Sequence, residues 1–232
     1  MKPIKFIENL SFSNDNELIA CGSNGRGAEI FMKQGDLDAA CAIYSLMMML
    51  IINHRINRKQ LINRDTKPGY NSVKRLQDQF LGGVRGLYKG GYYFNDLRDE
   101  LKSSFKKEAT ACTFSTISDS RPKRDDLVSK SELHNTIRET LDSGYPVQIG
   151  YSYKRGNSGH SVVAIGYQEY KEGEALRLFC LDPSHELAPL AYWNNIIDIT
   201  LDNNTRSKYQ DWSHAEEKGW NNCNVDEILI IE

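Results

Sequence analysis

The apolar run from Ala39 to Ile52 constrains the fold of this chain more than any other stretch. It is shorter than the roughly 20 residues that a membrane-spanning helix needs. Its apolar side chains recur at helical spacing, so the sequence predicts a helix that is mostly buried in a protein core. The residues on the predicted buried face are Ile43, Leu46, Met47, Leu50 and Ile51.

Polar residues indicate where this helix begins and ends. Asp38 can serve as its N-cap, which would place Cys41 in the first turn. We expect the helix to continue to about Asn63, with basic side chains near its end that suit the negative end of the helix dipole. These side chains are Arg55, Arg58 and Lys59. The prediction is a central buried helix with a cysteine at its N-terminus.

The overall charge and the cysteine count exclude several classes of protein. The chain has 232 residues, with Lys+Arg 29 against Asp+Glu 31 and a pI near 6.2, which argues against a dedicated nucleic-acid binder. The first residues, MKPIKFIENLSFSNDNE, lack the long apolar core of a signal peptide. Five cysteines with no Cys-x-x-Cys pair favour a reducing compartment and no structural zinc.

The periodicity changes from helical to strand-like along the chain. Helices are predicted around Val73–Phe80, from Tyr92 to Leu101, and after the capping box Ser129-x-x-Glu132. Strands are predicted at Glu17–Ala20, Pro146–Tyr153, His160–Tyr167, Leu176–Leu181, Ile196–Leu201 and Val225–Ile231. Loops are predicted at Cys21–Gly27, at the glycine-rich run Leu81–Gly91 and at the linker Ser115–Asp126.

Segregation of helices and strands defines an α+β class. We predict a single catalytic domain over residues 1–232, with a helical half at about 28–143 and a sheet half at about 144–232. The glycine-rich run and Tyr88, Tyr92 and Tyr93 are interpreted either as a substrate-facing rim or as a loop packed by its tyrosines, the second being preferred.

Cys41 is the candidate nucleophile because of its position. Partial positive charge at a helix N-terminus favours the thiolate form of a cysteine. Most cysteines are small buried hydrophobic residues, and we expect this of Cys112, Cys180 and Cys223. A polar turn delivers Cys41 to the start of its helix, which distinguishes it from the others.

A thiolate nucleophile needs a base and a group that orients the base. His160 alone among the five histidines opens a strongly β-patterned strand directly after a glycine turn. If the strands at 160–168 and 176–182 form a hairpin centred near Lys171, His160 lies opposite or almost opposite Asp182. Side chains opposed in an antiparallel pair are about 5 Å apart at Cβ, within reach of an imidazole–carboxylate hydrogen bond.

Gln34 is the candidate oxyanion donor. It precedes Cys41 by seven residues and carries a side-chain amide. Beside the Cys41 backbone N–H, such an amide would bind the oxygen of a tetrahedral intermediate.

These motifs together resemble those of a papain-like cysteine peptidase. The motifs are Gln34-Gly-Asp-Leu-Asp-Ala-Ala-Cys41, Gly144-Tyr-Pro-Val, Gly159-His160-Ser-Val-Val-Ala-Ile-Gly166 and Leu181-Asp182-Pro. They are most similar to those of the bacterial peptidases related to the bacteriocin leader-processing (double-glycine) domain. The resemblance implies a central nucleophile helix packed on an antiparallel sheet, with Gln34, Cys41, His160 and Asp182 as the catalytic set. Papain itself has asparagine as its third residue, where this chain has aspartate.

The resulting hypothesis is a cysteine hydrolase that cleaves a peptide or isopeptide bond through an acyl-enzyme. The alternatives are a papain-like glutamine deamidase or transglutaminase effector, and an inactive binding module of the same fold. A protein or peptide partner is expected, with no cofactor, metal, nucleic acid or membrane span. We expect a cytoplasmic protein, or an effector delivered by a route that needs no signal peptide.

Overall fold

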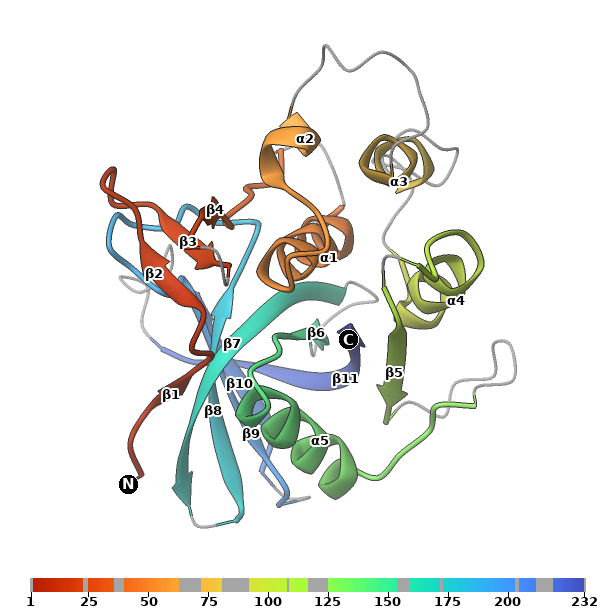
Figure 1. Ribbon diagram of the computed structural model, residues 1–232. Helices are drawn as coiled ribbons and strands as arrows, with labels where there is room; N and C mark the ends of the chain where they lie inside the picture. The colour runs from red at the N-terminus through yellow and green to blue at the C-terminus, as the bar shows by residue number, and fades with distance from the viewer. Residues whose placement is uncertain are drawn as a thin grey trace.

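The strands build a closed barrel, and the helices lie along one side of it (Figure 1). The computed structural model describes residues 2–22, 25–35, 40–62, 72–80, 92–107, 109–116, 125–153, 159–171, 173–202, 205–211 and 219–231. The helices are α1 (Cys41–Ile52), α2 (Arg58–Ile62), α3 (Ser72–Phe80), α4 (Phe94–Ser104) and α5 (Lys130–Asp142). The strands are β1 (Lys5–Phe6), β2 (Leu10–Phe12), β3 (Leu18–Cys21), β4 (Gly27–Glu29), β5 (Ala111–Ser115), β6 (Val147–Tyr153), β7 (Gly159–Lys171), β8 (Ala175–Leu181), β9 (Asn195–Thr200), β10 (Ser207–Asp211) and β11 (Asn221–Ile231).

The main sheet is antiparallel and closes on itself. Its order is β7-β6-β11-β10-β9-β8, and β8 pairs again with β7, so these strands form a barrel. Closure removes the open edges that a flat sheet would present to other chains. β1 extends β7 and β5 extends β11 outside the closed circuit, while β2, β3 and β4 form a separate small sheet. The sheet half predicted from sequence is therefore a barrel rather than an open layer.

Helix α1 is covered on nearly every side. Ten of its twelve residues are buried, and it packs against β6, β7 and β4 (Figure 1). A helix that is apolar all round needs such complete cover. β7 is likewise buried through most of its length, because the barrel interior lies on one face and α1 on the other. This packing confirms the predicted buried helix.

Three predictions about the ends of α1 are wrong. The helix ends at Ile52 with Asn53 as C-cap, and α2 is a separate short helix, so the chain is not helical to Asn63. Its last turn holds no basic residue, because the three cations follow the turn at Asn53. The N-cap position is Ala40, which makes no side-chain cap bond, while Asp38 lies outside the described residues.

The capping box produces helix α5 as predicted. The Ser129 hydroxyl accepts the Glu132 backbone N–H at 3.2 Å, and Leu133, Ile137 and Leu141 are buried. α3 and α4 also agree with the predicted helices, and the strands at β3, β6, β7, β8, β9 and β11 agree to within a few residues. The sequence patterns missed β1, β2, β4, β5 and β10, which are short strands with at most one fully buried residue or a mixed pattern.

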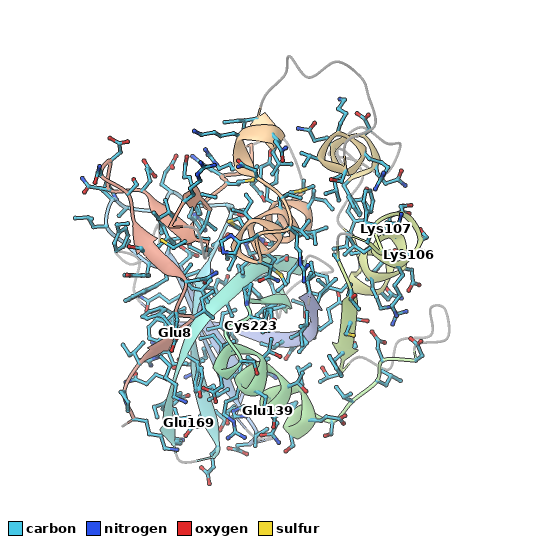
Figure 2. All side chains as sticks on the ribbon, in the orientation of Figure 1. Glu8, Lys106, Lys107, Glu139, Glu169 and Cys223 are labelled. Atoms are coloured by element: carbon cyan, nitrogen blue, oxygen red, sulfur yellow. The ribbon has the colours of Figure 1, made fainter. Side chains whose placement is uncertain are left out.

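The predicted linker and one cysteine need correction. Ser115 is the last residue of β5, and its N–H donates to the Asp126 carbonyl at 2.8 Å, so both ends of the linker are fixed in the fold. Cys112 on β5 is exposed rather than buried, whereas Cys180 and Cys223 are buried as expected; Figure 2 shows Cys223 among the barrel strands. Tyr92 packs against Phe80, but the glycine-rich run and Tyr88 lie outside the described residues.

The close approach of β1 to β7 predicts a sharp effect of one substitution. A Cβ added at Gly166 would lie 2.5 Å from the Lys5 carbonyl oxygen and from a ring carbon of Phe6. We expect Gly166→Ala to lower the free energy of unfolding by about 2 kcal/mol, because β1 must shift to admit the methyl group. Gly159→Ala is the control, since its Cβ meets only the Tyr151 carbonyl at 3.5 Å. Urea unfolding measures both, and equal stabilities would contradict the argument.

Among the described residues, no helix is both long and apolar enough to span a membrane.

Candidate active site

Cys41 is the first residue of α1 and is half-buried. The amides of the first helical turn have no partner within the helix, so they and the helix dipole place partial positive charge at the thiol. This agrees with the prediction that Cys41 lies in the first turn. Cys41 contacts His160, which lies near the start of β7, and the contact is a side-chain hydrogen bond that favours the protonated imidazole.

His160 and Asp182 are in direct contact. His160 Nε2 lies 2.7 Å from Asp182 Oδ1, and both side chains are nearly inaccessible to solvent. The predicted contact between the His160 and Asp182 side chains is therefore confirmed. The hairpin register differs from the predicted one: Val163 pairs with Leu181, so His160 is registered with position 184 and Asp182 lies two residues short of it. The turn is centred near Gly173 rather than Lys171, because Lys171 pairs with Ala175. Register shifts at Ala164/Gly166 and Glu169/Lys171 then bring the strands back by two residues towards the predicted register.

Several donors besides His160 converge on Asp182. The Ser184 backbone N–H donates to Oδ1 at 2.8 Å, and the Asn195 side-chain amide donates to Oδ2 at 2.8 Å. Asn194 bonds the backbone of Asp182 on both sides, accepting from its N–H at 2.6 Å and donating to its carbonyl at 2.9 Å. The carboxylate is thus fully satisfied as an anion although it is buried. No sequence pattern singled out the two asparagines.

The two partners of this buried pair shift each other's pKa. Burial alone would lower the pKa of His160, but the charge and hydrogen bond of Asp182, helped by Cys41, raise it to about 10. Burial alone would raise the pKa of Asp182, but His160, the Ser184 N–H and the Asn195 amide hold it below its ordinary value. The arrangement therefore stabilises an imidazolium beside a carboxylate.

A buried polar network ties the start of α1 to the strand that carries His160. The Gln148 amide donates to the Ala42 carbonyl at 2.9 Å and to the Ser161 hydroxyl at 2.9 Å. The Ser45 hydroxyl donates to the Ser161 carbonyl at 3.0 Å. Ala42 follows Cys41 and Ser161 follows His160, so these bonds fix the candidate nucleophile relative to the candidate base. In the sequence, the one sign of this network is Gln148, a polar residue within the predicted strand Pro146–Tyr153.

The backbone of Gln34 lies beside Pro183, the residue that follows Asp182. Its backbone N–H donates to the Pro183 carbonyl at 2.8 Å, and its side chain is half-buried. This bond brings the glutamine segment and the acid segment together although they are far apart in sequence. Residues 36–39, which connect Gln34 to the start of α1, lie outside the described part of the chain.

Among the described histidines, only His185 also touches this cluster, and it does so through its backbone: its N–H donates to the Asp182 carbonyl at 3.4 Å and its carbonyl accepts from the Asn194 amide at 3.0 Å. His54 follows α1, the His185 ring lies 3.7 Å from Asp211, and His134 is buried on α5, while His214 is outside the described residues.

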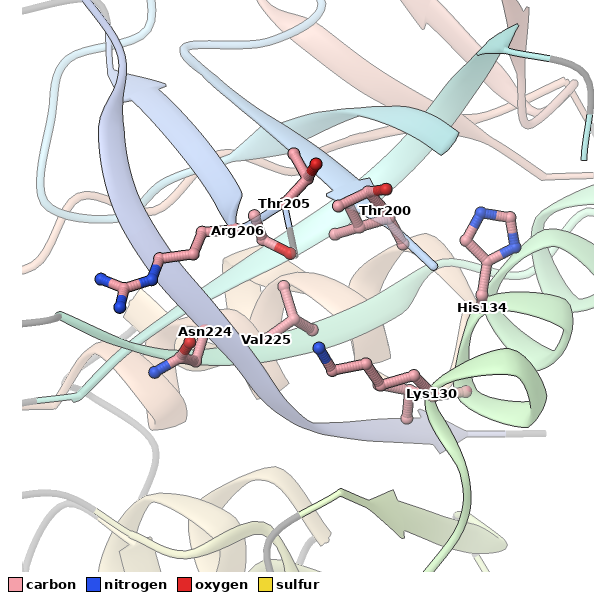
Figure 3. A pocket seen from close by; sticks show the side chains of 10 residues that line it. Lys130, His134, Thr200, Thr205, Arg206, Asn224 and Val225 are labelled. Carbon is pink, nitrogen blue, oxygen red and sulfur yellow. The ribbon is translucent and has the colours of Figure 1, made fainter. Parts of the chain in front are cut away.

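His134 lines a cavity of about 180 Å³ between α5 and strands β9, β10 and β11 (Figure 3). The Lys130 amine points into this cavity and the Arg206 guanidinium points away from it. None of the four predicted site residues lines it.

The pKa shifts of His160 and Asp182 predict how folding stability depends on pH. His160 binds its proton more tightly in the folded protein than at its ordinary pKa of 6.5, so the pair's contribution is complete below about pH 6.5 and is lost as pH rises towards about 10. The lowered pKa of Asp182 means that the contribution is also lost as pH falls below the ordinary value of 3.8.

We therefore expect the stability advantage of wild type over His160→Gln to be largest between about pH 4 and 6.5 and to shrink by at least about 1 kcal/mol by pH 10. Urea unfolding across this range measures the difference. An advantage that stays constant with pH would contradict the ion pair.

Comparison with known proteins identifies the family of the chain. The sequence matches the model of the Peptidase_C39 like family over residues 30–210, well over half of the chain. A search of curated proteins found no match. Among solved structures, the crystal structure of UfSP from C. elegans aligns with a TM-score of 0.44 and 16% identity, covering 100% of this chain and 34% of that chain.

The match covers well over half of the chain, so the chain belongs to the Peptidase_C39 like family. The match confirms the resemblance that the motifs carried to the papain-like cysteine peptidases. The chain combines helices with strands, as the predicted α+β class requires.

Proposed function

We propose that this protein hydrolyses a peptide or isopeptide bond through a covalent thioester at Cys41. The observation that supports this most strongly is the 2.7 Å contact between His160 Nε2 and Asp182 Oδ1 beside a cysteine at a helix N-terminus. Because Nε2 is engaged by Asp182, Nδ1 is the ring nitrogen that can take the thiol proton. Nucleophile, base and orienting acid are thus assigned to Cys41, His160 and Asp182.

The proposed reaction has two steps. The Cys41 thiolate attacks the substrate carbonyl carbon, and the His160 imidazolium gives its proton to the leaving nitrogen as the C–N bond breaks. A water molecule then attacks the thioester while His160 takes one of its protons, and the carboxylic acid leaves as the thiolate re-forms. Asp182 stays ionised and stabilises the imidazolium.

The oxyanion of each tetrahedral intermediate would be bound by the Gln34 side-chain amide and the Cys41 backbone N–H. Two observations support this assignment. Cys41 begins α1, where backbone amides point out of the helix, and Gln34 is bonded through its backbone to the residue that follows Asp182.

We further propose that residues 1–232 act as one catalytic domain in a reducing compartment, the cytoplasm or a cell into which the protein is delivered. Pairing of β1 and β5 with barrel strands supports one domain, because the N-terminal segment and a strand from the predicted helical half both extend the sheet. Five free cysteines support a reducing compartment.

Selective alkylation tests the proposed nucleophile. We expect iodoacetamide at pH 6 to modify Cys41 at least about tenfold faster than exposed Cys112, as followed by mass spectrometry of the two peptides. His160→Ala should remove this difference, because the thiolate loses its imidazolium partner. Equal rates at the two cysteines in the wild-type protein would overturn the proposal.

Incubation with candidate proteins separates the two kinds of reaction. Cleavage of the chain would support hydrolysis of a peptide bond, whereas a mass gain of about 1 Da without cleavage would indicate deamidation of a glutamine side chain.

A further inference from the structure

Asn195, the first residue of β9, holds the side of Asp182 that faces away from His160. Its side-chain amide donates to Asp182 Oδ2 at 2.8 Å, while Oδ1 accepts from His160 and from the Ser184 backbone N–H. Asn195 is 0% exposed and Asp182 is 1% exposed, so water has little access to either side chain. The two carboxylate oxygens therefore have different and fixed partners.

Asn194 fixes the backbone of Asp182 at the same point. The backbone pairing of β8 with β9 ends at Cys180 and Asn195, and the Asn194 N–H still reaches the Cys180 carbonyl at 3.1 Å. After this last backbone bond, the Asn194 side chain replaces the strand as the partner of Asp182. It bonds the N–H and the carbonyl of Asp182 as the backbone of a neighbouring strand would. Adjacent asparagines thus hold the acid by its backbone and by its side chain.

We propose that Asn195 is a positioning residue for catalysis, which sets the rotation of the Asp182 carboxylate so that Oδ1 faces His160. This inference rests on the proposed function. A carboxylate turns easily about its Cβ–Cγ bond, because that torsion has a broad minimum. A donor on Oδ2 stops the rotation, and a neutral amide does so without adding a charge that would compete with His160. Asn195 acts through Asp182 and His160 and has no contact of its own with the reacting atoms.

Paired substitutions at position 195 separate hydrogen bonding from packing. Leucine has the branched shape of asparagine with bulkier methyl groups and no donor, whereas alanine leaves space that a water molecule can fill. If the amide orients Asp182, Asn195→Leu should slow alkylation of Cys41 by iodoacetamide about tenfold at pH 6, with Asn195→Ala less affected. At pH 9 both should lie within about twofold of wild type, because a thiol ionises there without help. Cys112 in the same sample is the internal reference.

Asn53→Ala is the matched control. The Asn53 amide donates to the Ile231 carbonyl at 2.7 Å at the other end of α1, so its loss also removes one hydrogen bond from an asparagine amide, here to a backbone carbonyl instead of a carboxylate. We expect this variant to lose thermal stability while its ratio of alkylation rates at pH 6 and pH 9 stays at the wild-type value. A change in Tm alone is therefore not evidence for positioning.

The possible outcomes distinguish this inference from the proposed function. If Cys41 is selectively reactive in wild type and Asn195→Leu keeps the wild-type ratio of rates, the positioning role is wrong and the proposed function stands. If Cys41 reacts no faster than Cys112 in wild type, the proposed function itself fails. Should Asn195→Leu not fold, a wild-type ratio in Asn195→Ala and in Asn195→Ser, whose hydroxyl is too short to replace the amide donor, would overturn the positioning role.

Discussion

Cys41→Ser is expected to lose about 10⁴-fold or more of the cleavage activity while the protein remains folded. Serine differs from cysteine by one atom, so the bonds from Gln148 to Ala42 and from Ser45 to Ser161 remain in place. An alcohol is, however, a much weaker acid than a thiol, so the variant lacks the anionic nucleophile that the proposed mechanism uses.

Cleavage of a diverse peptide mixture, followed by mass spectrometry, measures this loss without a known substrate. Cys112→Ser is the control, because Cys112 is exposed on β5 and outside the site. We expect it to keep wild-type activity, and both variants to keep a Tm within about 3 °C of wild type. Retained cleavage in Cys41→Ser would contradict thiol chemistry at this position.

Asp182→Asn is expected to reduce cleavage by about 10³-fold. Donors from His160, Ser184 and Asn195 converge on the carboxylate, which accepts from all of them. An amide has one oxygen, so its NH₂ group must face one of these donors unless the Asn195 amide turns over. The variant also removes the negative charge that raises the pKa of His160, so the imidazolium loses its main support.

The rate of Cys41 alkylation at pH 6 and the rate of peptide cleavage measure this effect independently. Asp198→Asn is the matched control: Asp198 lies on β9 and pairs with Arg177 through two bonds of 2.8 and 2.9 Å, remote from His160. We expect the control to retain activity within about twofold, because that pair is partly exposed. Full activity in Asp182→Asn would show that orientation by an amide suffices and that the charge is dispensable.

Local patterns in the sequence predicted the elements that depend on neighbouring residues. Ser129 and Glu132 form the predicted cap of α5, and the apolar run after Cys41 forms the predicted buried helix. Strand-like alternation located β6, β7 and β8, which carry or support the candidate base and acid. The same residues also carried the family resemblance that the sequence comparison confirmed.

Contacts that depend on register were beyond such patterns. The hairpin arithmetic placed Asp182 opposite or almost opposite His160. The turn lies two residues later than assumed, bulges in β7 recover part of that offset, and the contact forms diagonally through the reach of the side chains. Asn194 and Asn195 fell outside the strand predicted at Ile196–Leu201, so no role was predicted for them. Their role depends on where β9 meets β8, and no local signal specifies that.

The sequence by itself pointed to the candidate residues: a cysteine at the start of an apolar helix, a histidine at the start of a strand and an aspartate at the end of the next. Only the tertiary structure decided how they are held. Antiparallel pairing of β9 with β8 brings Asn195 beside Asp182, and the packing of α1 on β6 and β7 buries Gln148 between Ala42 and Ser161. The physical reason is that a buried polar side chain is specified by partners distant in sequence, whereas a helix cap or an amphipathic strand is specified by residues a few positions away.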